Sequence, residues 1–143
     1  MKVLHVDSDQ EPTTAFTFKS GVIVIRWSPD GKRLAASSQD GTVVILDPDN
    51  SDRELILGNH TGHAKDLAWS PDGRRLATCS SDRTIKIWDT TSGVQTLSFE
   101  AHDVSVMCLA WSPDGKQLVS AGGDGLIKFW DASLGYERAE SNE

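Results

Sequence analysis

The sequence predicts an all-β protein made of three copies of one antiparallel unit, and three observations predict it. The segments "WSPDGKRLA", "WSPDGRRLA" and "WSPDGKQLV" begin at Trp27, Trp69 and Trp111, which gives a repeat period of 42 residues. Within each unit, short runs rich in Val, Ile, Leu and Thr alternate with tight-turn signals. The sequence shows no convincing helical periodicity. A fixed period of this size is typical of stacked or radial repeat architectures, and each unit has room for about four strands.

Each unit carries two predicted turns whose residues suit their geometry. In "SPDG", Pro presets φ for the first central position and Gly closes a type I turn. The second turn contains an Asp, and the pairs at 40–41 and 124–125 are Asp-Gly, which suits a hairpin turn with positive φ. Repeat two has Arg83 where the other repeats have Gly, so we expect a different geometry for that turn. The strands that follow end at Asp47, Asp89 and Asp131.

The combination resembles the WD-repeat family of β-propellers. The resemblance rests on Trp88-Asp89 and Trp130-Asp131, on the "SPDG" turns, on the Asp of each inner turn and on the period, and it covers nearly the whole chain. It implies β-propeller blades that are four-stranded antiparallel meanders, three per chain. It also implies a non-catalytic scaffold that binds a protein or peptide, without a cofactor and without a metal.

The family has a buried hydrogen-bond network in each blade, which joins a His, a Ser or Thr of the second strand, the turn Asp and the Trp of the third strand. By resemblance, the members are His60, Thr78, Asp82 and Trp88 in repeat two, and His102, Ser120, Asp124 and Trp130 in repeat three. The matching positions of repeat one hold Phe18, Ala36, Asp40 and Leu46. Because a half-satisfied buried network is worse than an apolar core, we expect repeat one to pack as an apolar blade with Asp40 only in its turn.

The resemblance places the family's commonest contact surface at the axial mouth of the propeller. The matching positions lie six and four residues before the Trp that ends each first strand, and directly before each turn Asp. The candidate partner-binding residues are Gly21, Ile23, Gln39, His63, Lys65, Ser81, Ser105, Met107 and Gly123. Ile23 and Met107 would be exposed apolar groups suited to a peptide contact. The alternative is that these residues are ordinary strand positions that line a channel.

Three blades raise the problem of closure, because propellers usually have four to eight blades around a central channel. An open arc would expose blade faces and strand edges. We expect an N-terminal segment (1–18) whose residues 13–18 form an outer strand that completes the last blade of a neighbouring copy. The degenerate repeat one (19–58), repeat two (59–100), repeat three without its own outer strand (101–131) and a charged tail (132–143) follow.

The expected partner is therefore a second copy of the chain. A homotrimer with nine blades is favoured, because compressing the inner strands into six blades costs steric overlap; a homodimer with six blades is second. In either ring, head-to-tail contacts must close. The alternatives are completion by another polypeptide, or a chain that is part of a longer propeller.

Two other function classes stay open. A His, a Ser and an Asp in each network suggest a hydrolase, but the set recurs in two repeats and no Gly-x-Ser-x-Gly elbow is present. An enzyme with a site in the channel would need more than His63 and Lys65, since no partner carboxylate accompanies them. The remaining alternative is a purely structural, self-assembling propeller, or a propeller fragment, without a dedicated ligand.

Composition excludes further partners. The formal net charge of −7 argues against nucleic acid or an anionic membrane surface as the main partner. The longest apolar run, Val22 to Ile25, is far too short to span a bilayer, and we expect a cytoplasmic protein. Cys79 and Cys108 lie in apolar-patterned stretches, so we expect two buried free thiols in a reducing compartment.

Overall fold

The computed structural model describes residues 14–133, which fold into three antiparallel sheets. The first sheet contains β1 (Val22–Trp27), β2 (Leu34–Ser38), β3 (Thr42–Leu46) and β4 (Leu55–Asn59). The second contains β5 (Ala64–Trp69), β6 (Arg75–Ser80), β7 (Thr84–Asp89) and β8 (Gln95–Glu100). The third contains β9 (Val106–Trp111), β10 (Gln117–Gly122) and β11 (Ile127–Asp131).

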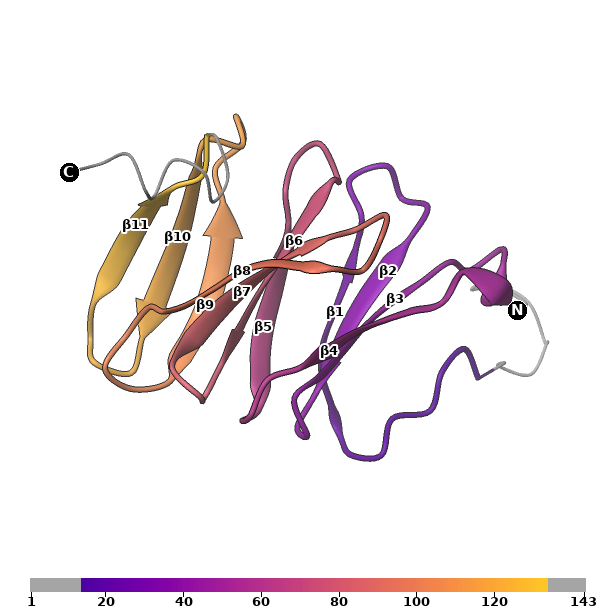
Figure 1. Ribbon diagram of the computed structural model, residues 1–143, viewed down its shortest axis with the longest axis horizontal. Helices are drawn as coiled ribbons and strands as arrows, with labels where there is room; N and C mark the ends of the chain where they lie inside the picture. The colour runs from indigo at the N-terminus through magenta and orange to yellow at the C-terminus, as the bar shows by residue number, and fades with distance from the viewer. Residues whose placement is uncertain (1–13, 134–143) are drawn as a thin grey trace, which may run out of the picture.

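Each sheet is a meander, because its strands pair in the order in which they follow one another along the chain. Figure 1 shows the three sheets side by side along the longest axis, with β1–β4 at one end, β5–β8 in the middle and β9–β11 at the other end. The first strands of the sheets are neighbours, since β5 contacts both β1 and β9. The predicted all-β class and antiparallel units are therefore confirmed, whereas closure of a ring by several chains stays a prediction.

Helical structure contributes little to the described residues. A single turn of 3₁₀ helix, η1 (Ser51–Arg53), precedes β4, and the side chain of Asn50 caps it by accepting a hydrogen bond from the Asp52 amide. Within residues 14–133, no helix has the length and apolarity needed to cross a membrane.

The third sheet has three strands in the part of the chain that the structure describes. That repeat three lacks its own outer strand stays a prediction, since most of the residues after β11 lie outside that part. The segment 13–18 stays a prediction as an outer strand, since residue 13 lies outside the described part and residues 14–18 pair with no strand of this chain. Instead, Phe16 and Phe18 pack against Ala36, Val44 and Leu46 of the first sheet. The rest of the segment 1–18 and most of the tail 132–143 also lie outside the described residues.

The tight turns repeat one geometry in all three units. The φ of Arg83 is 75°, close to the 88° of Gly41 and the 80° of Gly125 in the equivalent turns. The expectation of a different geometry for repeat two is therefore wrong. Asp82 fixes the turn by accepting hydrogen bonds from the amide and the hydroxyl of Thr84, so Arg83 adopts a left-handed conformation that costs it about 1–2 kcal/mol.

The hydrophobic core occupies two joints, one between the first and second sheets and one between the second and third. In the first joint, Ile45 packs with Leu67 and Leu76. In the second joint, Ile85 packs with Val106 and Leu118. These side chains belong to neighbouring sheets. Each sheet therefore buries apolar side chains against the facing side of the next sheet.

One tryptophan of each joint reaches back to the preceding sheet. Trp69 Nε1 donates to the carbonyl oxygen of Arg26 at 3.1 Å, and Trp111 Nε1 donates to that of Ala68 at 2.9 Å. Donors and acceptors are each 42 residues apart. The hydrogen bond between the sheets therefore repeats with the period of the sequence.

An arginine of each joint reaches forward to the following sheet. Arg33 lies 5.1 Å from the ring centroid of Trp69, and its guanidinium donates to two carbonyl oxygens of the second sheet's loops at 2.5 and 3.2 Å. Arg75 lies 4.5 Å from the ring of Trp111 and donates to two carbonyl oxygens after β9 and β11 at 3.4 and 2.9 Å. In the third repeat this position is Gln117.

The two cysteines differ in exposure. Cys79 is buried in the second joint, where burial and the nearby Asp66 carboxylate raise the pKa of its thiol far above the usual range. Cys108 is exposed, so the expectation of a second buried thiol is wrong. Cys108 lies on β9 of the third sheet, and no further sheet among residues 14–133 covers it.

Candidate functional site

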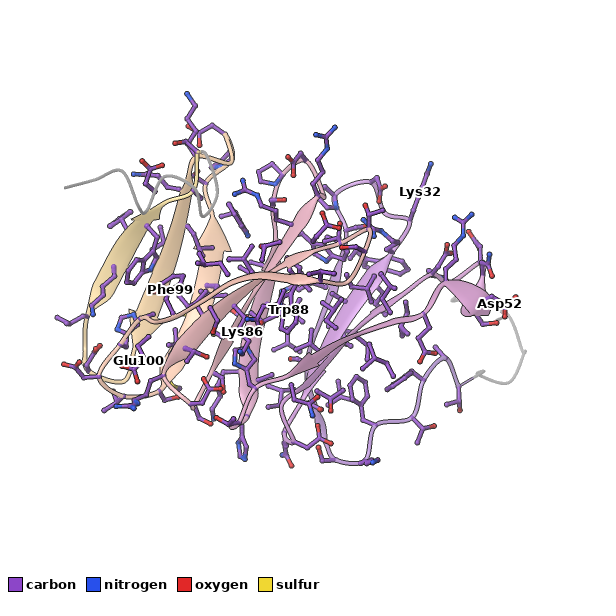
Figure 2. The ribbon with its side chains drawn as sticks, in the orientation of Figure 1. Lys32, Asp52, Lys86, Trp88, Phe99 and Glu100 are labelled. Atoms are coloured by element: carbon purple, nitrogen blue, oxygen red, sulfur yellow. The ribbon has the colours of Figure 1, made fainter. Side chains whose placement is uncertain are left out.

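The structure brings the four predicted network residues of repeat two together. Trp88 Nε1 donates to Thr78 Oγ1 at 2.9 Å, and Thr78 Oγ1 lies 2.8 Å from His60 Nε2. His60 Nδ1 lies 3.0 Å from Asp82 Oδ2. His60, Thr78 and Trp88 are buried, and Figure 2 shows Trp88 in the interior. The four side chains come from the loop before β5, from β6, from the β6–β7 turn and from β7.

The network has a direction that fixes the proton on His60. The Thr78 hydroxyl accepts from the indole and donates its own proton to His60 Nε2, which leaves Nδ1–H to donate to Asp82. Burial lowers the pKa of His60 against the opposing effect of the Asp82 carboxylate. Burial would raise the pKa of Asp82, but hydrogen bonds from Thr84 and the neighbouring His60 hold it at about 2. A neutral histidine and an ionised aspartate are therefore the stable pair.

Repeat three builds the same arrangement. Trp130 Nε1 donates to Ser120 Oγ at 2.9 Å, Ser120 Oγ lies 2.8 Å from His102 Nε2, and His102 Nδ1 lies 2.9 Å from Asp124 Oδ2. Phe99 of β8, which Figure 2 labels, contacts Trp130 edge-on, with 4.8 Å between the ring centroids. The outer strand of one sheet thus covers the network of the next.

Repeat one has apolar packing at the same place. Phe18 packs against the buried Ala36 and Leu46, and Asp40 lies in its turn. The Asp40 carboxylate accepts from the Ser38 hydroxyl at 2.5 Å and from the Thr42 amide at 3.0 Å, and these hydrogen bonds lower its pKa to about 2. This arrangement matches the predicted apolar blade.

The candidate partner-binding residues meet in pairs at one end of the three sheets. Three backbone amides each donate to a carbonyl oxygen at 2.9 to 3.0 Å. The pairs, donor first, are Gln39 and Gly21, Ser81 and His63, and Gly123 and Ser105. The Ser81 hydroxyl also accepts from the His63 amide at 2.8 Å. The structure therefore brings six of the nine residues into three equivalent loop contacts.

The remaining three candidates, Ile23, Lys65 and Met107, are the extra residues of β-bulges. The register between β1 and β2 shifts between Val22 and Val24, and the register between β5 and β6 shifts between Ala64 and Asp66. The pairing of β9 with β10 shifts at the equivalent place. A bulge leaves one residue unpaired and turns its side chain away from the regular alternation. The sequence did not predict this feature, which occurs at the same repeat position three times.

The nine candidate partner-binding residues differ in exposure. Gly21, Gln39, His63, Met107 and Gly123 are exposed. Ile23, Lys65, Ser81 and Ser105 are half-buried. Among the described residues, Ser105 Oγ is a buried side-chain atom without a hydrogen-bond partner. These nine positions thus combine apolar, basic and small polar groups.

Asp66 is a site residue that sequence analysis missed. Its carboxylate lies on β5, accepts from the Leu109 amide of β9 at 3.0 Å and lies 3.5 Å from the Arg26 guanidinium of β1. It thereby links all three inner strands. A groove of about 290 Å³ lies beside it, lined in part by Trp27 and Trp69. The signal that could have found it is an aspartate two residues after Ala64 and directly before the apolar Leu67, inside a strand that the repeat pattern places in the core.

The described residues offer no cluster of three His, Cys, Asp or Glu side chains that could hold a metal ion. His60 uses both ring nitrogens within its network, so it has no lone pair left for a metal beside His63.

Comparison with known proteins gives the family. The chain matches the WD40 family, described as WD domain, G-beta repeat, over residues 11–47, 53–89 and 93–131. A segment of 41 residues is 44% identical to the WD repeat-containing protein VIP3 of Arabidopsis thaliana, and it covers 29% of this chain and 13% of that protein. Because three matched repeats cover well over half of its residues, the chain belongs to the WD-repeat family.

Proposed function

We propose that this chain is a non-catalytic WD-repeat scaffold that binds a protein or peptide at the loop end of its blades, the axial mouth of an assembled propeller. WD-repeat domains generally serve as protein-interaction scaffolds. The observation that carries the proposal is the threefold recurrence of a bulged residue beside a loop contact, at Ile23, Lys65 and Met107. Recognition commonly uses loops held by a rigid scaffold, and bulges re-aim side chains for that purpose.

The chemistry of these residues suggests what is bound. Met107 is 48% exposed and offers a flexible, polarizable apolar contact. His63 and Lys65 add basic character on the neighbouring sheet, within a chain whose formal net charge is −7. An extended segment with an apolar side chain next to an acidic one would complement both features.

Catalysis has less support than binding. Each network histidine contacts an aspartate and a hydroxyl that already accepts from a tryptophan, so the Ser120 or Thr78 oxygen is not free to act as a nucleophile. The repeated networks therefore support a role in blade stability.

The assembled form belongs to the same proposal. We favour a homotrimer with nine blades over a homodimer with six, because additional blades widen the channel and avoid crowding the inner strands. Either ring would bring the loop ends of all blades to one mouth.

A selection experiment tests the binding proposal. The immobilised full chain is panned against a phage-displayed peptide library, and dissociation constants of the enriched peptides are measured by calorimetry. Met107→Asp is expected to weaken binding about tenfold or more, because a hot-spot apolar contact is lost. Val94→Asp is the matched control, since Val94 is also exposed but lies in the turn between β7 and β8. Absence of enrichment, or equal affinity of both variants, would contradict the proposal.

A further inference from the structure

The first sheet has an open apolar face whose equivalents are covered elsewhere. Ile25 and Trp27 on β1 are each 56% exposed. The equivalent residues of β5, Leu67 and Trp69, are 1% and 8% exposed, because the first sheet packs against them. The same β1 face also presents Val22. We call it the leading face.

The third sheet has the opposite open face. Ile127 and Phe129 on β11 are 67% and 66% exposed. Their equivalents in the second sheet, Ile85 and Ile87, are 0% and 7% exposed, because the third sheet covers them in the second joint. We call this the trailing face. Large apolar faces of this kind mark interaction surfaces.

We infer that the trailing face of one copy binds the leading face of a second copy, and that this contact reproduces the two joints inside the chain. The residues of the two faces are the period equivalents of those that already pack in both joints. The contact is therefore continuous with an interface that the molecule forms twice. The inference deepens the proposed assembly and does not depend on the peptide-binding proposal.

The internal joints also predict a hydrogen bond in the joint between two copies. The acceptors of the Trp69 and Trp111 indoles are the carbonyl oxygens of Arg26 and Ala68, and the next position at the same period is Ala110. Trp27 of the second copy would thus donate to the Ala110 carbonyl oxygen of the first. Trp27 is exposed in the single chain because the sheet that would supply its acceptor belongs to another copy.

Residues 14–18 already lie where the new joint needs them. In the internal joints, the outer strand of one sheet packs on the third strand of the next: Phe99 stacks on Trp130, and Gly58 leaves room for the ring of Trp88. Phe16 and Phe18 pack in the same way around Leu46, the first-sheet equivalent of those tryptophans. Residues 14–18 therefore occupy the position of an outer strand that belongs to a preceding sheet.

The repeats place that strand beside β11, and the two internal pairs give registers that differ by one residue. The pair Ile85 and Phe99 between β7 and β8, moved by the period, places residue 15 of the second copy opposite Ile127 (85 + 42 = 127; 99 − 84 = 15). The pair Val43 and Gly58 between β3 and β4 places residue 16 there (43 + 84 = 127; 58 − 42 = 16). Both predict that residues 14–18 add a fourth strand to β11, which covers its free edge.

One position makes the new joint weaker than the internal ones. Arg33 and Arg75 cover the tryptophan of the following sheet and donate to its loops, whereas the third repeat has Gln117. A glutamine supplies no cation over the ring. The joint between copies thus lacks the arginine contact, which gives a variant that should strengthen it.

The first measurement is the solution mass of the full chain by light scattering over a range of concentrations. The chain has a mass of 15.6 kDa, so a closed dimer gives 2 × 15.6 = 31.2 kDa and a closed trimer gives 3 × 15.6 = 46.8 kDa. Either mass supports the joint, and 46.8 kDa is the expected one. A constant mass of 15.6 kDa up to high concentration overturns the inference.

Three variants test the geometry of the joint. Gln117→Arg should tighten association by about 3- to 30-fold, the range expected for one cation–π contact. Trp27→Asp should give a monomer, and Val94→Asp should keep the wild-type mass. Circular dichroism checks that each variant is folded. If Gln117→Arg leaves the association unchanged, or if Trp27→Asp still assembles or grows into large species, the joint is not the one inferred here.

The outcome is separable from that of the peptide experiment. A stable monomer that still selects peptides through Met107 removes the joint and leaves the scaffold function. An assembled ring that selects no peptide leaves the joint and removes the scaffold function.

Discussion

The hydroxyl of Thr78 is the centre of the second-sheet network, because it accepts from Trp88 and donates to His60. Thr78 and its counterpart Ser120 are both buried. A buried hydroxyl with both functions satisfied stabilises one arrangement of its neighbours and penalises others. The pairing of His60 with Asp82, 22 residues later, thus ties the loop before β5 to the turn after β6.

Removing the indole donor tests the network at this scale. Trp88→Phe should lower the free energy of unfolding by about 1–3 kcal/mol, because the Thr78 oxygen loses a buried donor. Urea denaturation monitored by circular dichroism measures the change. The reverse exchange in the first sheet, Leu46→Trp, should bring no gain in stability, since Ala36 offers the new indole no acceptor and the site is already filled. A gain there would contradict the apolar interpretation of repeat one.

The proton of His60 gives the network a pH dependence. Burial lowers the pKa of His60 below its ordinary value of 6.5. Just below pH 6.5, the unfolded chain therefore binds a proton at His60 while the folded protein does not. The contribution to stability is complete above pH 6.5 and is lost as the pH falls below it. Acidification from pH 7 toward pH 5 should therefore lower the unfolding midpoint in urea.

Two histidine variants isolate this effect. His60→Gln should flatten the dependence of the midpoint between pH 7 and pH 5, whereas His63→Gln should retain it because His63 is exposed at a loop. Equal slopes in the two variants would assign the pH dependence elsewhere. A separate loss is expected as the pH falls from about 4 toward 2, because an unfolded aspartate with its ordinary pKa of 3.8 binds a proton before Asp82, with its pKa of about 2, does so.

At the scale of the element, the first strand of each sheet combines two functions through its bulge. The residues after the bulge, such as Leu67 and Trp69, are buried in a joint. The bulged residue itself, such as Lys65, leaves the ladder at the loop end. A bulge separates these functions, because it breaks the alternation that would otherwise link them.

The arginine of each joint should contribute through its planar shape as well as its charge. Arg75→Lys is expected to lower the free energy of unfolding by about 0.5–2 kcal/mol, since an ammonium cannot cover Trp111 and reach two carbonyl oxygens together. Arg74→Lys is the control, because Arg74 is exposed and its side chain lies outside the joint. Urea unfolding compares the two, and equal stabilities would show that charge alone suffices.

The sequence predicts elements well where the cause is local. The strands and the "SPDG" turns follow from alternation and turn chemistry over a few residues, and the turn around Arg83 was missed because Asp82 overrides the preference of an arginine. The bulges could not be predicted, since Ile23, Lys65 and Met107 share no property except their position. The joints were missed although Arg33 and Arg75 repeat with the period.

The candidate site also contains features that local sequence patterns could not predict. The networks came from resemblance to a family, because a contact such as that of His102 with Asp124 spans 22 residues and no local pattern reveals it. Cys108 was expected to be buried, and its exposure depends on whether another sheet follows the third one. Such long-range features depend on the arrangement of whole sheets and not on neighbouring residues.

At the scale of the whole molecule, the contacts between sheets run along one direction. β5 contacts β1 and β2 of the first sheet, and β9 contacts β5 and β6 of the second. The second sheet has a neighbour on both sides, while the outer two each have one open face (Figure 1). In such an array, stability is close to a sum of unit and nearest-neighbour contributions. A further joint between copies would therefore add a nearest-neighbour contribution of the same kind, reduced by the arginine contact that Gln117 does not supply.

The tryptophans of the joints donate to backbone oxygens, first of Arg26 and then of Ala68. Every amino acid carries that oxygen, so the receiving position is free to mutate without any loss of the bond. For this hydrogen bond, a unit can be duplicated, deleted or exchanged with one from a distant relative without a matching change in the unit next to it. A change in the number of units therefore keeps this bond at every joint, whatever residue stands at the receiving position.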